Sequence, residues 1–306
     1  MCYAIHMKLF GDYHIHSKYS RDAVNQGTID EIAKMAKSKG LAEIAITDHG
    51  PKVWVGAKPK HYPQLKAMIE RAEADHAIRV FFGIEANIRG MKGETDIPEE
   101  FLKDLDIIVC GYHPRTRPAN FRSLMTMFWP NYIFMFTHAA FRYYPKWLRR
   151  RNTEALKRVI EQNNIDIVAH PNRYFKVDVV DVARTCVEHG TLLELNGKGI
   201  SFRPIDFERC VAIGAKFIIN SDAHKLNDIG RTERVSEFLK NCDFEETDIV
   251  NMAGLFKRPE INRLAKISAD DGTTSDQDME TKPKLTKQEI KEKKKRDKVM
   301  RAKAVE

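Results

Sequence analysis

Histidine, aspartate and glutamate residues follow short apolar segments at six places along this sequence. The positions are His14 and His16, Asp48 and His49, Glu85, His113, His170, and Asp222 and His224. Imidazole and carboxylate groups bind zinc, manganese and iron in proteins. One such residue at the end of a strand is more often structural, but burying so many of them together would be costly without cations. The pattern therefore predicts a site that binds more than one metal ion.

The segments before these residues are rich in β-forming side chains and predict seven strands. Their ranges are 9–13, 43–47, 80–84, 106–110, 166–169, 191–195 and 216–220. Helical patterns between them cover 64–77, 152–163, 177–189 and 232–240, and a further helix is expected from a capping box at Thr28 and Glu31 to a stop at Gly40. Repeated β/α units predict an α/β protein with a closed or nearly closed parallel barrel, and an open doubly wound sheet is the alternative.

A barrel of this kind would bring the predicted ligands together, because the carboxyl ends of its strands converge on one face. Side chains alternate along a strand, so His14 and His16 lie on the same side and can bind one ion. Asp222 and His224 have the same spacing near the other end of the chain.

The composition of the chain excludes some classes of protein and some kinds of site. With 42% apolar and 31% charged residues in a chain of 306, a wholly disordered protein is excluded. The first ten residues lack the basic start and apolar run of a secretory signal, so we expect a cytoplasmic protein. The five cysteines form no C-x-x-C pair, which argues against a disulfide framework and a thiolate zinc site; they are Cys2, Cys110, Cys186, Cys210 and Cys242.

The charge pattern predicts three parts of the chain. We expect one folded domain over residues 1–268, then an acidic linker at 269–281 with five acids and no base. Residues 282–306 carry 11 bases and four acids and are expected to form a basic, solvated, helical tail. A contact of this tail with nucleic acid or another acidic partner is the alternative.

The motifs around the predicted ligands resemble those of the PHP (polymerase and histidinol phosphatase) family, particularly its YcdX-like stand-alone metal-dependent phosphatases. The resemblance covers roughly residues 7–240 and rests on the segments GDYHIHSKYSRDA, AITDHGP, GIEANI, LDIIVCGYHP, IVAHPNR, LELN and NSDAH, in this order. It implies a distorted seven-stranded β/α barrel, similar to a TIM barrel, that holds two or three divalent metal ions and hydrolyses phosphate esters.

The resemblance also implies ligand sets. His14, His16, Glu85 and Asp222 would hold one ion, Glu85 would bridge to a second held by His113 and His170, and the third would take Asp22, His49 and His224. The sequence departs from the family at Asp22, where the related phosphatases often have histidine. An oxygen ligand there favours manganese, iron or magnesium over zinc at the third position. Zinc, manganese and iron all remain candidates for the whole site.

The chemistry expected of such a site is hydrolysis by a metal-activated water, with catalytic roles for Glu85, Asp222 and His224. No G-x-S-x-G elbow, Walker A loop or G-x-G-x-x-G motif offers another route. Arg173 and Asn196 are candidates to contact the phosphate. The carboxylates of Asp12 and Asp48 are expected to orient the imidazole rings of the ligands.

An unusual insertion separates His113 from His170. Residues 115–151 contain eight arginines or lysines, no acid and ten aromatic residues. We expect a lid or an oligomer contact beside the site, whose arginines attract an anionic substrate and whose aromatic side chains stack on a ring. A segment bound to a membrane surface is the alternative. A membrane-spanning helix is not expected, because Pro130, Asn131 and hydroxyl side chains interrupt the uncharged stretch at 123–141.

Three functions remain open on this basis. The leading hypothesis is a phosphatase that hydrolyses a phosphate monoester on a small metabolite. A phosphodiesterase or exonuclease is the alternative, because the basic tail and the aromatic insertion suit single-stranded nucleic acid. A metal-stabilised binding module without activity is a lesser alternative, favoured only by the substitution at Asp22. The sequence predicts no oligomeric state.

Overall fold

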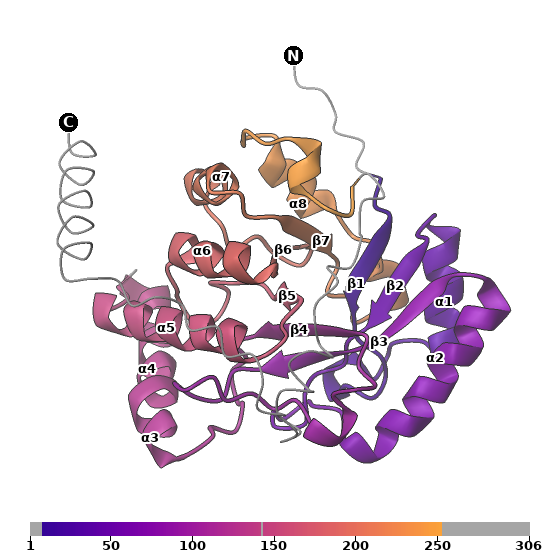
Figure 1. Ribbon diagram of the computed structural model, residues 1–306, viewed down its shortest axis with the longest axis horizontal. Helices are drawn as coiled ribbons and strands as arrows, with labels where there is room; N and C mark the ends of the chain where they lie inside the picture. The colour runs from indigo at the N-terminus through magenta and orange to yellow at the C-terminus, as the bar shows by residue number, and fades with distance from the viewer. Residues whose placement is uncertain (1–7, 142, 253–306) are drawn as a thin grey trace, which may run out of the picture. The chain divides into compact units, whose positions relative to one another are not determined.

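The computed structural model describes residues 8–141 and 143–252 (Figure 1). The chain divides into two compact units, Met1–Ile261 and Asn262–Glu306. The second unit lies outside the described residues. The same holds for the end of the domain expected near residue 268, the acidic linker at 269–281 and the basic tail at 282–306.

Seven parallel strands follow one another in chain order. They are β1 (Gly11–Ile15), β2 (Glu43–Ile46), β3 (Arg79–Asn87), β4 (Ile107–Gly111), β5 (Ile167–Val168), β6 (Leu192–Asn196) and β7 (Phe217–Asn220). An isolated parallel bridge between Ile15 and Ala223 joins the first strand to the chain just after the last one. His16 N–H donates to the Ala223 carbonyl there at 3.0 Å. The predicted, nearly closed barrel is thereby confirmed and the open sheet is wrong.

Helices surround the strands, with α1 and α2 on one side and α5 to α7 on the other (Figure 1). The helices are α1 (Ile29–Ser38), α2 (Tyr62–His76), α3 (Phe121–Ser123), α4 (Trp129–Phe141), α5 (Lys146–Gln162), α6 (Val179–His189), α7 (Pro204–Ala212) and α8 (Glu233–Leu239). A π-helical turn at Leu124–Phe128 joins α3 to α4. Short 3-10 helices lie at Arg21–Ala23, Pro59–His61, Glu99–Phe101, Leu226–Asp228 and Glu246–Asp248.

Local signals explain where α1 begins and ends. The Thr28 hydroxyl accepts a hydrogen bond from Glu31 N–H, and the Glu31 carboxylate accepts one from Thr28 N–H. This confirms the predicted capping box, which satisfies two amide groups that the first helical turn leaves free. Gly40 follows the helix with a φ of 78°, a left-handed conformation that glycine adopts without steric cost.

The two sides of each strand have different surroundings. Alternate residues such as Phe82 and Ile84 of β3 pack in the main core between strands and helices. Phe81 on the opposite side of β3 belongs to a second apolar cluster, with Ile107, Ile218 and others, inside the barrel. Glu85 lies four residues after Phe81 and thus points to the same side. The barrel interior is therefore apolar along most of the strands and polar at their carboxyl ends.

The described residues contain four of the five cysteines, all free: Cys110, Cys186, Cys210 and Cys242. Within the same residues, no helix is both long enough and apolar enough to cross a membrane.

Candidate metal centre

All nine predicted metal ligands lie at one end of the barrel, either at the carboxyl ends of strands or in the segments that follow them. Seven of them are buried, whereas His224 is half-buried and Asp22 is exposed. The donor atoms of six of them form three close groups that overlap at Glu85, His16 and His49. Asp22, His170 and Asp222 lie beside these groups, and together they make up the three ligand sets that the family resemblance implies. The structure therefore brings together residues from widely separated parts of the sequence, as the barrel interpretation required.

The first group contains His14, His16, Glu85 and Asp222. The two Nε2 atoms of His14 and His16 are 3.2 Å apart. Glu85 Oε1 lies 3.3 Å from His14 Nε2, and Glu85 Oε2 lies 3.4 Å from His16 Nε2. Asp222 Oδ1 is 3.4 Å from His16 Nε2 and 3.9 Å from His14 Nε2.

The second group is arranged around the same glutamate. Glu85 Oε1 lies 3.0 Å from His113 Nε2 and 3.0 Å from His170 Nε2. Its other oxygen, Oε2, is 2.7 Å from His49 Nδ1. Glu85 is thus placed between two sets of imidazoles, which is the position of a bridging carboxylate.

The third group is the most accessible one. Asp22 Oδ2 lies 3.2 Å from His49 Nε2 and 3.3 Å from His224 Nε2. The ring of His16 is close to both imidazoles, with centroid distances of 4.4 Å to His49 and 4.2 Å to His224. The Asp22 side chain is about one-third exposed, so this group faces the solvent.

The donor set fits divalent cations. Ligand atoms around a cation bound at 2.0–2.1 Å are separated by roughly 2.9–3.4 Å, and most of the distances above fall in this range. His49 Nδ1 and Glu85 Oε2 are buried and 2.7 Å apart, yet neither has a hydrogen-bond partner among the described residues. Two buried polar atoms that lie this close without a well-formed hydrogen bond are suited to bind a cation instead.

Electrostatic interactions within the cluster shift its pKa values in opposite directions. Burial opposes ionisation of Glu85, but the imidazoles of His113, His14 and His49 hold its pKa well below the usual value. Burial lowers the pKa of His16, and the nearby His224 and His49 lower it further. Burial opposes the protonation of His14 and His49, but the Glu85 carboxylate raises the pKa of both, to about 10 for His49. Imidazoles that carry a proton beside ionised carboxylates release it when a metal ion binds.

Glu194 supports the cluster and was missed in the sequence analysis. It is fully buried at the middle of β6, and its Oε1 lies 2.7 Å from His14 Nδ1. Its Oε2 accepts a hydrogen bond from His170 N–H at 2.8 Å. One carboxylate thus orients a ligand of the first group and a ligand of the second. The spacing of Glu194 and Asn196, two residues apart on one strand like His14 and His16, is the signal that could have revealed it.

Asp12 and Asp48 hold the loops that carry the ligands. Asp12 accepts hydrogen bonds from Ser221 N–H at 3.0 Å and from Gly230 N–H at 2.9 Å, which ties β1 to the loop after β7. Asp48 accepts one from the Ser20 hydroxyl at 2.7 Å, and Ser20 Oγ lies 3.4 Å from His16 Nδ1. Their carboxylates therefore contact backbone and hydroxyl groups, and Asp48 reaches an imidazole only through Ser20.

Two cationic side chains lie beside Asp222. Arg173 Nη1 donates to Asp222 Oδ2 at 3.1 Å and to Asn196 Oδ1 at 3.4 Å. Lys198, which the sequence analysis did not select, donates to Asp222 Oδ1 at 3.0 Å, and its Nζ lies 2.6 Å from His224 Nδ1. The predicted phosphate-contact residues Arg173 and Asn196 are thus placed next to the metal-ligand groups, together with a second cation.

Unusual backbone conformations gather here. Positive φ values occur at Arg115 (65°), His170 (27°), Asn172 (71°) and Asp222 (53°). Among the described residues one further non-glycine position, Ala77 after α2, shares this conformation. Left-handed residues other than glycine cost about 1–3 kcal/mol each and persist where the surroundings hold them, which is typical of functional sites.

A cavity of about 460 Å³ opens above the metal-ligand groups. Its floor includes His49, His113 and Asp222, and its wall includes Trp54 and Phe136. Tyr132, Met135 and Phe136 come from α4, so the insertion lies beside the cavity as expected. This volume suits a small molecule.

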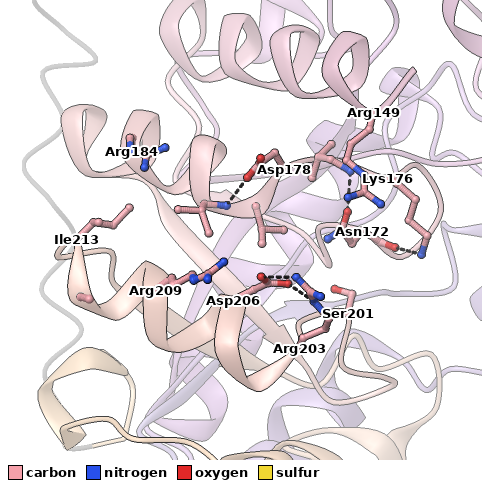
Figure 2. A pocket seen from close by; sticks show the side chains of 14 residues that line it. Arg149, Asn172, Lys176, Asp178, Arg184, Ser201, Arg203, Asp206, Arg209 and Ile213 are labelled. Atoms are coloured by element: carbon pink, nitrogen blue, oxygen red, sulfur yellow. Dashed lines mark hydrogen bonds and ion pairs between the residues drawn. The ribbon is translucent and has the colours of Figure 1, made fainter. Parts of the chain in front are cut away.

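A larger cavity of about 890 Å³ lies between α5, α6 and α7 (Figure 2). It is lined by the cations Arg149, Lys176, Arg184, Arg203 and Arg209. Arg203 is paired with Asp206 at 2.6 Å. None of the metal-ligand groups found among the described residues includes a residue of this cavity. We therefore place the chemistry in the smaller cavity.

Comparisons with known proteins show the family to which the chain is similar. The model of the PHP domain family matches residues 12–198. A probable phosphatase of Thermoanaerobacter sp. (strain X514) is 31% identical over 254 residues, covering 80% of this chain and 91% of that protein. A probable phosphatase of Acetivibrio thermocellus is 30% identical over 245 residues, covering 78% of this chain and 88% of that protein.

Solved structures share the fold, and one of them holds ligands. The histidinol phosphate phosphatase of Lactococcus lactis, determined with zinc, L-histidinol and phosphate, has a TM-score of 0.51 to this chain at 15% identity. The match covers 80% of this chain and 97% of that one.

Proposed function

The chain belongs to the PHP domain family and is a metal-dependent phosphatase, and on this premise we propose that its substrates are phosphate monoesters of small metabolites. The predicted family resemblance is thereby confirmed. The observation that carries the proposal is the set of neighbouring metal-ligand groups, two of which share Glu85, beside a cavity of about 460 Å³.

The predicted metal ligands form one group for each of three ions. His14, His16, Glu85 and Asp222 would hold one ion, and Glu85, His113 and His170 a second. The more exposed Asp22, His49 and His224 would hold a third. Two or three divalent ions of this kind activate a water and neutralise charge on the phosphate oxygens. Zinc, manganese and iron suit the imidazole-rich groups, and the Asp22 oxygen favours manganese, iron or magnesium at the third position.

The remaining polar groups can orient the phosphate. Arg173 and Lys198 place two positive charges beside the metal-ligand groups. Arg173 Nη1 lies 3.1 Å from Asp222 Oδ2, and Lys198 Nζ lies 3.0 Å from Asp222 Oδ1. Asn196 Nδ2 donates to the same carboxylate at 3.2 Å. Guanidinium and ammonium groups held in this way place positive charge beside phosphate oxygens with little loss of side-chain freedom. We assign to Glu85, Asp222 and His224 the catalytic roles expected from the sequence.

The cavity supports a small phosphorylated substrate. It is lined by the ligand groups and by Tyr132, Met135 and Phe136 of α4. A volume of about 460 Å³ suits a molecule of metabolite size. The choice of a monoester over a diester is part of our proposal, and the experiment below decides it.

The test uses 4-nitrophenyl phosphate and bis(4-nitrophenyl) phosphate as monoester and diester. Metal-free protein is reconstituted with manganese, zinc or iron, and turnover is compared with that of Asp222→Asn. The matched control is Asp30→Asn, which removes an exposed carboxylate paired with His76 on the outer surface. We expect monoester turnover that falls at least about 100-fold in Asp222→Asn and is unchanged in the control.

A preference for the diester would overturn the monoester assignment in favour of the nuclease alternative. Tight metal binding with no release of phosphate from any member of a phosphorylated-metabolite panel would favour a binding module without activity.

A further inference from the structure

The inserted segment presents a row of large apolar side chains to the solvent. From α3 through the π-helical turn to α4, five such side chains have exposed fractions of 45% to 75%: Phe121, Met125, Trp129, Ile133 and Phe136. They are spaced by four, four, four and three residues, which places them on one face of a helix. The opposite face is buried through Met127, Phe128 and Asn131. We call the exposed row the apolar stripe.

A second group of exposed aromatic side chains lies at the start of α5, beside α4. The ring of Phe134 in α4 lies 6.1 Å from that of Tyr143 and 6.4 Å from that of Trp147. Tyr143 and Trp147 are themselves exposed, at 59% and 51%. Figure 1 shows α3 and α4 at one edge of the molecule, next to α5. Aromatic groups therefore extend across two neighbouring helices at this edge.

The surface around the apolar stripe is strongly basic. Residues 115–151 carry eight arginines or lysines and no acid. Among those that the structure describes, the exposed ones are Arg115, Arg117, Arg122, Lys146, Arg149 and Arg150. The Arg151 guanidinium lies 5.4 Å from the centre of the Trp147 ring. Aromatic side chains interleaved with arginines are typical of segments that lie in the interface of a membrane.

The segment is held firmly enough to act as a preformed surface. Asn131 Nδ2 donates to Asn152 Oδ1 at 2.8 Å, and Asn152 Nδ2 donates to the Tyr144 hydroxyl at 2.7 Å. Arg151 Nη1 donates to the Thr126 carbonyl at 2.7 Å. These buried contacts join the π-helical turn and α4 to α5, so the apolar stripe needs no folding step before it binds a partner.

We propose that the apolar stripe and the start of α5 dock on an anionic lipid surface, with the aromatic side chains among the headgroups and the arginines and lysines at lipid phosphates. Charge complementarity favours this partner over a second copy of the chain. A second copy of the chain, docked through the same face, would bring two basic segments without acids into contact, and like charges across an interface are unfavourable. An anionic bilayer attracts each basic residue near its surface.

Docking of this kind would place the mouth of the catalytic cavity at the lipid surface. Phe136 belongs both to the apolar stripe and to the cavity wall, and the exposed Trp54 lines the same wall. The inference does not depend on the identity of the substrate, since the apolar stripe lies outside the metal-ligand groups.

The test measures co-sedimentation of the full chain with vesicles of phosphatidylcholine and phosphatidylglycerol at 3:1, and with phosphatidylcholine alone. The variants are Ile133→Ser and the double variant Trp129→Ser with Ile133→Ser. Ile205→Ser in α7 is the matched control, because Ile205 is 47% exposed and Ile133 is 45% exposed. We expect binding to the anionic vesicles only, with affinity reduced at least about tenfold in the double variant and unchanged in the control.

To exclude unfolding as the cause of weaker binding, the melting temperature and the metal content of each variant are measured. We expect both to match those of the wild type. Equal binding of the double variant and the wild type would overturn the proposal, because the affinity would then come from other basic parts of the chain. Absence of vesicle binding, together with a dimer that Ile133→Ser dissociates in sedimentation velocity, would assign the apolar stripe to self-association instead.

Discussion

Replacing Glu194 by glutamine tests whether one buried carboxylate orients ligands of two metal positions. Its Oε1 faces His14 Nδ1 at 2.7 Å and Asn220 Nδ2 at 3.0 Å. Its Oε2 accepts hydrogen bonds from His170 N–H at 2.8 Å and Asn196 Nδ2 at 2.9 Å. Glutamine keeps the shape of the side chain but offers only one acceptor oxygen. Its amino group must face one of these two pairs of donors.

The magnitude follows from these contacts. Two donors lose their acceptor inside a buried site, and each such loss costs about 1–3 kcal/mol, so we expect a destabilisation of about 2–6 kcal/mol. In a domain of this size that corresponds to a decrease in melting temperature of roughly 4–24 °C. Loss of a carboxylate that orients a metal-binding histidine typically lowers metal affinity about 10- to 100-fold.

The assay is competition for zinc between the protein and a chromophoric chelator, at a temperature where the variant is folded. The control is Glu43→Gln, which removes a carboxylate bound by the Tyr13 hydroxyl at 2.8 Å at the start of β2, the opposite end of the barrel. We expect its zinc affinity to stay within about twofold of the wild type. A folded Glu194→Gln variant with wild-type zinc affinity would refute the role that we assign to Glu194.

Three further predictions follow from the structure. Removal of the metals with a chelator should lower the melting temperature by about 10 °C at saturating starting metal, because ions that bind only the folded state stabilise it by mass action; calorimetry measures this change. Asn152→Ala should cost about 2–4 kcal/mol in urea denaturation, since it leaves Asn131 and the Tyr144 hydroxyl without their shared partner; a cost below about 0.5 kcal/mol would contradict this network. Gly56→Ala should reduce both stability and metal affinity, as its Cβ would overlap with the Gly50 carbonyl oxygen in the loop after His49; unchanged metal content in the purified variant would show that this loop adjusts freely.

Much of the barrel could be predicted from the sequence, because each strand is a short apolar segment that ends in a polar ligand. The predicted strand at 80–84 proved longer, and β3 extends to Asn87, so Glu85 lies within the strand rather than after it. The first strand begins at Gly11 instead of Leu9 and likewise includes His14. Strand ends depend on pairing with neighbours, which a single segment does not encode.

The supporting residues were harder to predict. Glu194 lies inside the apolar run LLELN, where a buried charged residue is an exception that only its partners His14 and His170 justify. Lys198 follows a β-strand in a loop, and nothing local distinguishes it from a solvated lysine. The helix α7 at 204–212 was also missed, although Pro204 at its first turn is a recognised start signal.

Which side chains of the insertion are buried could not be predicted from its sequence. The sequence of an uncharged aromatic stretch does not predict which of its sides is exposed, since apolar residues occupy several sides of the π-helical turn and α4. Phe128 faces the core, Met135 the cavity, Phe134 the start of α5, and Ile133 the solvent. Only the packing of α4 against α5 and the barrel decides which of these side chains are buried.

The most direct test of the account is a titration of metal-free protein with manganese or zinc, with metal content and release of phosphate from 4-nitrophenyl phosphate measured at each step. Because the ligand groups share Glu85, we predict little activity at one ion per chain and a steep increase as the second ion binds. Full activity of the metal-free protein, or activity complete at one ion per chain, would contradict a catalytic centre of two or more ions.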